Sequence, residues 1–232
     1  MFNKLSIIIP AYNEERTISE IISRIKAVDL GSIEKEIIVV DNNSTDSTFE
    51  LVKKIERVRV FIEKTRGKGA AVKRGFKEAT GEILIIQDAD LEYDPQDYSA
   101  VIKPILDGKT EVTNGVRKEN KMKESKSLEI GIFAWLGNFA ITWTTNILYF
   151  NNAGEYEGCY KAFTSRLLKS IEVKTNDFDF DNELMCKILK KGYKIVDVPI
   201  HYNPRGYEDG KHISWKHGFK ILWTIFKYRF VD

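Results

Sequence analysis

The 232-residue sequence predicts an α/β fold with a mostly parallel, Rossmann-like central sheet flanked by helices. Apolar strand-like runs alternate with amphipathic segments at intervals of roughly 30 residues, which favours right-handed strand-helix-strand units. The run at 83–86 is apolar at every position, as expected for a strand buried on both faces. Because 43% of the residues are apolar, the chain can bury a substantial core, as one large domain or as one domain with an appendage.

The first 117 residues follow this alternation in order. Strands are predicted at 5–10, 36–40, 58–62, 83–86 and 111–116. The first helix carries one apolar stripe, and its members are Ile18, Ile21, Ile22, Ile25 and Val28. Further helices are predicted from the polar cluster 41–47 to about 55, from 67 to about 80, and over 95–106. Asp94 and Pro95 suit the N-cap and the first helical position of the last of these.

The pattern changes after Arg117. A hydrophilic loop at 118–126 precedes an uncharged segment at 130–150, whose length alone would suit a membrane span. Polar residues dilute that segment, so we expect one or two helices lying on the core or at a bilayer surface. Strands at 159–163 and 194–199 and helices at 182–190 and 218–230 complete the prediction. The last helix has an aromatic stripe, Phe219, Leu222, Trp223, Phe226 and Phe230, which by itself is more typical of core packing.

Composition narrows the classes of function. A net charge of +2 gives no global field for nucleic acid, although basic residues gather from Arg205 onward. Two cysteines form no disulfide framework and indicate a reducing compartment. Three histidines without metal-ligand spacing disfavour zinc. The first residues lead directly into a strand pattern without a signal peptide, so we expect a cytoplasmic protein.

Polar turns follow four of the predicted strands, at 10–14, 41–46, 66–69 and 88–92. The carboxyl ends of parallel strands meet at one edge of a sheet, where ligands bind in open α/β folds. Asp88 and Asp90 predict a Mg²⁺ or Mn²⁺ site, with an acidic turn before the next helix as the alternative. Asp41 can accept hydrogen bonds from a base or ribose, and Lys68 between two glycines can approach a phosphate, although Gly-Lys-Gly is also an ordinary turn. Together the turns favour a metal-bridged nucleoside diphosphate.

These residues carry a family resemblance. Ile7-Ile8-Ile9-Pro10-Ala11-Tyr12-Asn13-Glu14, Val39-Val40-Asp41-Asn42-Asn43-Ser44-Thr45-Asp46, Gly67-Lys68-Gly69-Ala70-Ala71 and Asp88-Ala89-Asp90-Leu91-Glu92 resemble the successive motifs of glycosyltransferase family 2. The segments 199–205 and 209–215 are similar to its polyprenyl-phosphate hexosyltransferase branch, such as dolichyl-phosphate mannose and glucose synthases. The resemblance spans nearly the whole chain and implies a single domain of GT-A fold.

The resemblance implies an inverting, metal-dependent transfer of a hexose from a UDP- or GDP-hexose to a polyprenyl phosphate. Residues 1–117 would form the nucleotide-sugar-binding half, and 118–232 the acceptor-binding half with membrane-surface helices near 128–150 and 218–230. The nucleotide sugar would be held by Pro10, Tyr12, Glu14, Asp41, Asn43, Lys68, Asp88 and Ala89. The metal would be held by Asp88, Asp90 and Glu92, and phosphates by Arg117, Arg205 and Lys211.

Two positions depart from the family pattern. Asn42 replaces the usual second acid after Asp41, so that role passes in our expectation to Asp46, and Glu155 stands where an aspartate is usual. The alternatives also remain open. A hydroxyl acceptor would need a general base from the acidic segment, with Asp177, Asp179, Asp181 and Glu183 as candidates, or the same residues form a solvated turn.

A phosphate acceptor needs no strong base, because with a second pKa of about 6 it is already a dianion near neutral pH. The basic residues near the C-terminus, Arg205, Lys211, His212, Lys216 and His217, then suit phosphate and an anionic membrane surface, or form a solvated loop. We therefore expect a protein peripheral to the cytoplasmic face of a membrane. A non-catalytic binding module is a rival, and a sugar nucleotidyltransferase is a weaker one, since 5–13 lacks its glycine-rich loop.

Overall fold

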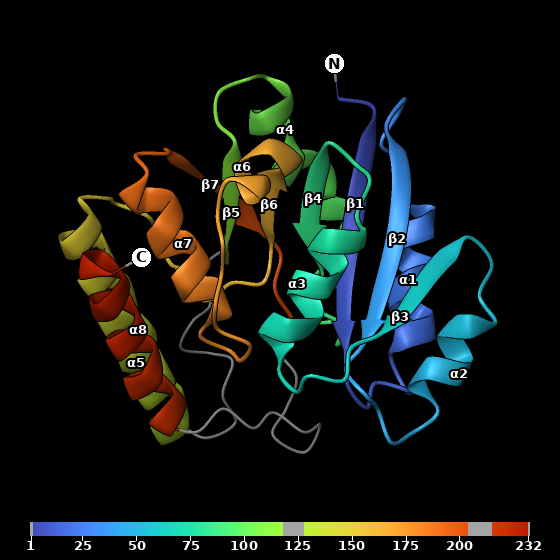
Figure 1. Ribbon diagram of the computed structural model, residues 1–232, viewed down its shortest axis with the longest axis horizontal. Coiled ribbons are helices and arrows are strands. Elements are labelled where there is room, and N and C mark those ends of the chain that lie inside the picture. The colour runs from blue at the N-terminus through green and yellow to red at the C-terminus, as the bar shows by residue number, and fades with distance from the viewer. Residues whose placement is uncertain (1, 118–127, 204–214, 232) are drawn as a thin grey trace.

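The computed structural model describes residues 2–117, 128–203 and 215–231, and it has the predicted α/β architecture (Figure 1). Seven strands form one sheet in the order β3-β2-β1-β4-β6-β5-β7. Their bounds are β1 Lys4–Ala11, β2 Glu34–Asp41, β3 Val58–Ile62, β4 Ile83–Ile86, β5 Val112–Arg117, β6 Lys161–Thr164 and β7 Ile195–Ile200. Each predicted strand is therefore present within a few residues of its expected ends.

Strand direction decides where the polar turns meet. β1 pairs in parallel with β2 and β4, β2 with β3, and β5 with β7. β6 is antiparallel to both β4 and β5, so among the described strands it alone is reversed. The carboxyl ends of β1, β2, β3 and β4 consequently lie at one edge, and Lys161, at the amino end of β6, joins them there.

Helices cover both faces of the sheet. Their bounds are α1 Ile18–Ala27, α2 Thr48–Lys53, α3 Lys68–Glu78, the 3₁₀ turn η1 Pro95–Asp97, α4 Tyr98–Leu106, α5 Leu128–Tyr149, α6 Ser165–Lys169, α7 Phe180–Lys190 and α8 Trp215–Phe230. The predicted cap is confirmed, since the Asp94 side chain accepts a hydrogen bond from Gln96 N at 3.0 Å. The 95–106 segment is thus a 3₁₀ turn followed by α4, and α6 is an element that the sequence pattern did not indicate.

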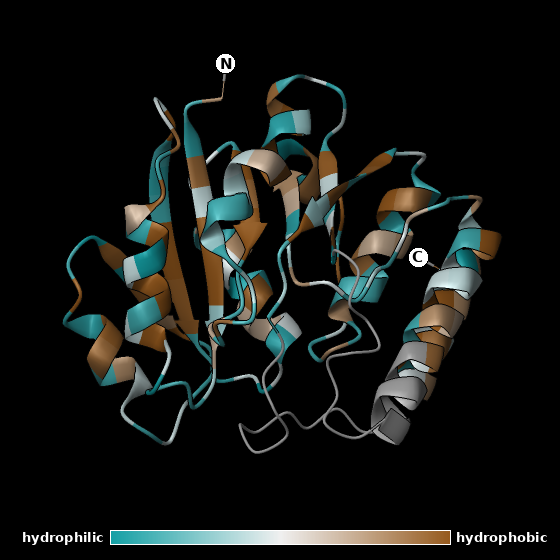
Figure 2. Ribbon diagram, turned by 180° about the vertical axis from the view of Figure 1, so that it is seen from behind, coloured by the Kyte–Doolittle hydropathy of each residue, from teal (hydrophilic) through white to brown (hydrophobic). Residues whose placement is uncertain are grey.

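Alternating side chains of the central strands make two cores. Ile7 and Ile9 pack with residues of α1 and α4, whereas Ile8 packs on the opposite face with Ile38 and Ala71 of α3. All these side chains are at most 4% exposed, and Figure 2 shows the hydrophobic colour concentrated on the central strands. This double burial explains why 83–86 and 7–9 are apolar without interruption.

The aromatic stripe of α8 does not lie in the core, so the core interpretation is wrong. The buried face of α8 is Ile221, Ile225 and Tyr228, which pack with Ile141 and Tyr149 of α5. The opposite face exposes Phe219, Trp223, Phe226 and Phe230, each at least half exposed, and only Leu222 of the predicted stripe packs against the cluster. Both faces of α8 are apolar, and its packing against α5 decides which one is buried.

The uncharged segment forms one helix, α5, which lies beside α8 at the side of the molecule (Figure 1). Side-chain exposure is described from residue 136 on, and one stripe remains open: Leu136, Phe139, Trp143, Ile147 and Phe150. In the part of the chain that the structure describes, the helices are all too short or too polar to cross a membrane.

Candidate active site at the carboxyl edge of the sheet

The turns after β1 and β2 are tied together by side-chain hydrogen bonds. Asn13 N donates to Ser44 Oγ at 3.0 Å, and Asn13 Oδ1 accepts from Thr45 N at 2.8 Å. Glu14 N donates to Thr48 Oγ1 at 2.8 Å. Asn13 has a φ of 54°, a left-handed conformation that asparagine tolerates. The predicted nucleotide-side turns at 10–14 and 41–46 are therefore adjacent, and Pro10 lies half-buried at the end of β1.

Asp41 ends β2 with a carboxylate that is only partly satisfied. The residue is 2% exposed, and its Oδ2 accepts from Ser44 N at 3.0 Å. Its Oδ1 is buried and accepts no hydrogen bond from the described residues. A buried acceptor without a donor is costly, so this oxygen suits an N–H or O–H group of a ligand. Asn43, exposed in the same turn, has a φ of 61°.

Tyr12 provides an aromatic ring beside the turn that contains Asp41. The residue is 46% exposed, and the Arg66 guanidinium lies 5.9 Å from the centre of its ring. An exposed ring held by a cation can stack against a planar base. Tyr12 and Asp41 thus supply, from neighbouring strands, the two kinds of contact that a nucleobase needs.

Lys68 and Asp88 form an ion pair where α3 meets the end of β4. Lys68 Nζ lies 2.7 Å from Asp88 Oδ1, and each side chain is 22% exposed. Burial lowers the pKa of Lys68, but the charge of Asp88 outweighs it and holds that pKa well above its usual value. Burial likewise raises the pKa of Asp88, and Lys68 more than offsets it. Both groups are therefore charged near neutral pH, and Asp88 already has a protein counter-ion.

The glycines around Lys68 serve packing of the chain. A Cβ on Gly67 would lie 2.0 Å from Asn176 O, and one on Gly69 would lie 2.5 Å from Phe180 Cβ. Ala70 N also donates to Asn176 O at 3.0 Å. The start of α3 is thus partly covered by the chain before α7, which differs from the expected approach of backbone to phosphate. The Lys68 side chain remains as the candidate phosphate contact.

The predicted metal residues lie in one turn but do not converge. Asp90 is half-buried, and its Oδ1 accepts from Glu92 N at 3.1 Å. Glu92 is 7% exposed and accepts from Tyr202 OH at 3.1 Å, while Ala89 is buried between the two aspartates. No group of three or more His, Cys, Asp or Glu side chains in the described ranges could hold a metal. The donor set still fits Mg²⁺ or Mn²⁺, because such ions are commonly held by one or two carboxylates plus substrate phosphates.

Arg117 lies at the end of β5, close to this turn. Its Nε and Nη2 donate to Glu155 Oε2 at 3.0 and 2.6 Å, and its guanidinium stacks 4.9 Å from the centre of the Tyr202 ring. Arg205 and Lys211, with His212, lie outside the described residues, as do the side chains of Lys216 and His217. The structure therefore brings one of the three predicted phosphate contacts to the edge that carries Glu92.

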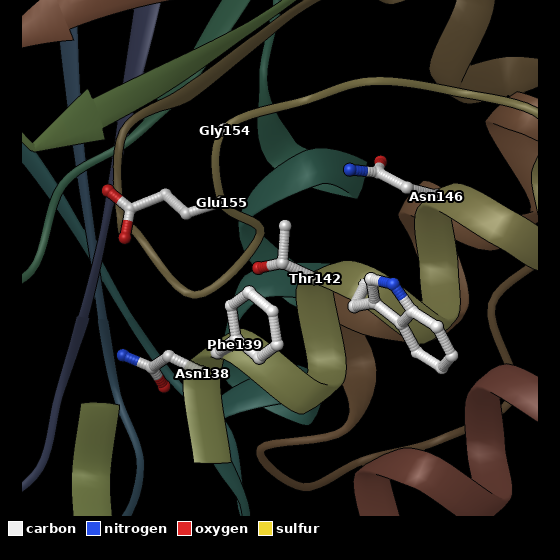
Figure 3. A pocket seen from close by; sticks show the side chains of 7 residues that line it. Asn138, Phe139, Thr142, Asn146, Gly154 and Glu155 are labelled. Carbon is white, nitrogen blue, oxygen red and sulfur yellow. The ribbon is translucent and has the colours of Figure 1, made fainter. Parts of the chain in front are cut away.

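A groove opens next to Glu155, between α5 and the 150–155 loop. Its volume is about 200 Å³, and its lining residues are Asn138, Phe139, Thr142, Trp143, Asn146, Gly154 and Glu155. Figure 3 shows Asn138, Phe139, Thr142 and Asn146 projecting from α5, and Gly154 and Glu155 from the loop. The groove combines aromatic rings with amide and hydroxyl groups, and one of its walls is the acid that holds Arg117.

The acidic segment before α7 is largely engaged in structure. Lys220 of α8 lies 3.0 Å from both Asp177 Oδ2 and Asp179 Oδ1. Glu183 is buried and accepts from the backbone N–H groups of Lys174 and Thr175 at 2.9 and 2.8 Å. Asp181, with a side chain 19% exposed, is left nearest to the site, 3.8 Å from Lys161 Nζ. Three of the four candidate bases are thus held by α8 or by backbone N–H groups, whereas the ion-pair partner of Asp181 among the described residues is Lys161.

Sequence reasoning missed a buried polar group beneath Asp88. Lys161 is 0% exposed and donates to Gly158 O. Glu157 accepts from Asn182 Nδ2 at 3.2 Å, and burial raises its pKa. Cys159 accepts from Asp88 N at 3.2 Å, and burial raises the pKa of its thiol well above the usual value. The sequence did contain a signal for this group, because Lys161 lies at the centre of the otherwise mostly apolar strand predicted at 159–163.

Asn42, which replaces the acid usual in the family, makes hydrogen bonds that an acid could not make in full. Asn42 Nδ2 donates to Glu63 O and Thr65 O at 3.0 and 2.7 Å, and its Oδ1 accepts from Gly67 N at 2.8 Å. The side chain therefore fixes the 63–67 loop. Asp46 accepts from Thr48 N and Glu15 N at 2.9 and 3.1 Å, so it orders the start of α2.

The fold and the edge define an α/β protein with a mostly parallel sheet and paired carboxylates after the central strand. The sequence profile of glycosyl transferase family 2 matches residues 6–169, and the chain belongs to this family of glycosyltransferases. The GT-A fold class is also confirmed by solved structures. A glucosyl-3-phosphoglycerate synthase from Mycobacterium tuberculosis, in complex with Mn²⁺, UDP and phosphoglyceric acid, superposes with a TM-score of 0.75 at 18% identity, covering 99% of this chain and 80% of that one.

Relatives with assigned names are similar over almost the whole chain. A dolichol-phosphate mannosyltransferase from Pyrococcus furiosus is 30% identical over 97% of this chain, which spans 63% of that protein's length. A UDP-N-acetylglucosamine–dolichyl-phosphate N-acetylglucosaminyltransferase from Methanococcus voltae is 26% identical, covering 94% of this chain and 93% of the relative. These names are consistent with the polyprenyl-phosphate branch that the motifs resemble.

Proposed function

We propose that this protein transfers a hexose, with inversion, from a UDP- or GDP-hexose to a polyprenyl phosphate. The observation that carries the donor half is the meeting of Tyr12, Asp41, Lys68 and Asp88 at one sheet edge. Tyr12 would stack on the base, and Asp41 Oδ1 would accept one of its N–H groups. Residues 1–117 would then serve the donor, and 118–232 the acceptor.

The diphosphate would lie between Lys68 and Asp90. Asp90 would hold Mg²⁺ or Mn²⁺ together with the substrate's phosphates, and Asp88 and Glu92 would support that turn. A divalent ion bound there supplies Lewis-acid stabilisation of charge on the leaving diphosphate. Lys68 would add a second positive charge, which its pair with Asp88 keeps protonated and fixed in position.

A phosphate acceptor fits the acceptor side better than a hydroxyl. An acceptor hydroxyl requires a base, yet Asp177, Asp179 and Glu183 are held by Lys220 and by backbone N–H groups. A lipid monophosphate is ionised already, and an arginine grips such a group through two N–H donors. Arg117 would make this contact, and we propose Arg205 and Lys211 as further ones. A hydroxyl acceptor would instead make Asp181 essential.

The exposed stripes of α5 and α8 support placement at a membrane surface, which we propose to be the cytoplasmic one. Trp143 of α5 and Phe150, which directly follows α5, are 59% and 88% exposed, and Trp223 and Phe230 of α8 are 65% and 68% exposed. Lys227 and Arg229 flank these rings on α8. Aromatic rings with adjacent cations suit the boundary of an anionic bilayer, where a polyprenyl phosphate resides.

Transfer of radiolabelled hexose to a short-chain polyprenyl phosphate tests the proposal. With Mg²⁺ or Mn²⁺ we expect a lipid-linked product from one of the UDP- or GDP-hexoses, and loss of that product with chelator or with Asp90→Ala. Absence of product across the common UDP- and GDP-sugars would contradict it. Tight UDP or GDP binding without any sugar release would favour a binding module.

A further inference from the structure

We infer that Glu155 is a positioning residue, which orients Arg117 so that its open edge can grip the acceptor phosphate. The inference rests on the proposed function and adds a residue that the motifs left without a role. Glu155 contacts Arg117 at three separate groups. Arg117 N donates to Glu155 Oε1 at 2.6 Å, while Nε and Nη2 donate to Oε2 at 3.0 and 2.6 Å.

The geometry of the pair leaves half of the guanidinium for a ligand. Glu155 occupies the Nε and Nη2 side, and in the described residues no hydrogen bond uses Arg117 Nη1. The end formed by Nη1 and the second Nη2 hydrogen therefore still offers two parallel donors, the arrangement that binds phosphate bidentately. The flat face of the same group is taken by Tyr202, whose ring centre lies 4.9 Å away.

Burial makes the pair rigid. The Glu155 side chain is 1% exposed and that of Arg117 is 15% exposed. Burial disfavours a charged arginine, but the hydrogen bonds and charge of Glu155 outweigh it and raise the pKa of Arg117. A long arginine side chain normally samples many rotamers, and two fixed contacts remove that freedom before a ligand arrives. Glu155 thereby lowers the entropic cost of binding the acceptor.

The pair also connects the groove between α5 and the 150–155 loop with the turn that carries Asp90 and Glu92. Glu155 lines the groove under α5, and Tyr202, which stacks on Arg117, donates its OH to Glu92 Oε2 at 3.1 Å. The open edge of Arg117 is therefore held between these two regions. An acceptor phosphate there would lie beside the turn that carries Asp90.

Glu155→Gln keeps the shape and removes the charge, so it tests the inference. We expect the KM for polyprenyl phosphate to rise about tenfold, while the KM for the nucleotide sugar and the slow hydrolysis of that sugar by water stay within twofold. Glu155→Asp retains a carboxylate and should recover part of the loss. A purely structural role would lower thermal stability and change both KM values together.

Glu36→Gln is the matched control. Glu36 is 8% exposed and pairs with Arg59 at 2.7 Å, at the opposite end of the sheet. It should destabilise the fold without changing the acceptor KM. An unchanged or lowered acceptor KM in Glu155→Gln would overturn the inference, since a lowered value would mean that Glu155 only cancels the arginine's charge. If the unmodified protein transfers no sugar to polyprenyl phosphate, the proposed function fails instead.

Discussion

Replacing Trp223 by serine should weaken binding to anionic vesicles. Trp223 is 65% exposed on the open face of α8. A tryptophan side chain buries up to about 250 Å², so about 160 Å² of this one is available to lipid. At about 25 cal/mol per Å², complete insertion would contribute about 4 kcal/mol. A helix at the bilayer boundary would bury about half of that area, or about 2 kcal/mol, which corresponds to a roughly 30-fold lower partition coefficient.

Sedimentation of the protein with extruded vesicles containing anionic phospholipid measures this coefficient. Ile62→Ser is the control, because Ile62 is 43% exposed on β3, across the sheet from α8 (Figure 1). We expect Ile62→Ser to partition like the unmodified protein, and added salt to weaken binding further through the flanking cations. Equal partitioning of the two variants, or no vesicle binding by the unmodified protein, would refute the assignment of this face to the membrane.

Three further predictions concern the donor site and the core. Asp41→Asn should weaken UDP or GDP binding by about 10- to 100-fold in calorimetry, because a charged acceptor is lost; unchanged affinity would contradict the base contact. Gly75→Ala should cost about 1–3 kcal/mol in urea unfolding, since its Cβ would lie 2.2 Å from Ile8 Cγ2; a neutral result would mean that Ile8 moves freely. Burial raises the pKa of Glu36, but bonds from Ser6, Thr80 and Arg59 outweigh it and lower that pKa. Its stabilisation is therefore present above the unfolded pKa of about 4.3 and lost as the pH falls through the folded value. The difference between the urea midpoints of the unmodified protein and Glu36→Gln should become smaller below about pH 4. A difference that does not change with pH would contradict the lowered pKa of Glu36.

Much of the fold and part of the candidate site could be predicted because they rest on local pattern. The apolar runs at 7–9 and 83–86 predict strands buried on both faces, and the Asp94-Pro95 pair predicts the start of a helix. Polar turns after parallel strands must share an edge, and Tyr12, Asp41, Lys68 and Asp88 do lie there.

Other features depend on which segments meet, and no local pattern encodes that. The Arg117 and Glu155 side chains are 38 residues apart in sequence, and only the reversal of β6 and the loop before it bring them together. In the sequence, the glycines at 67 and 69 predict a turn that binds phosphate through its backbone. In the structure, the chain at 176–180 occupies the space beside them.

The alternation of strands and helices, the edge where the polar turns gather and the family motifs follow from residue type and short spacing, so they are predictable without the structure. The buried face of α8 and the pairing of the charged groups depend instead on contacts between distant segments. Both faces of that helix are apolar, so hydrophobicity could not choose between them. Ile221, Ile225 and Tyr228 are buried because they pack against α5 and α7, and the aromatic face of α8 therefore remains exposed to solvent.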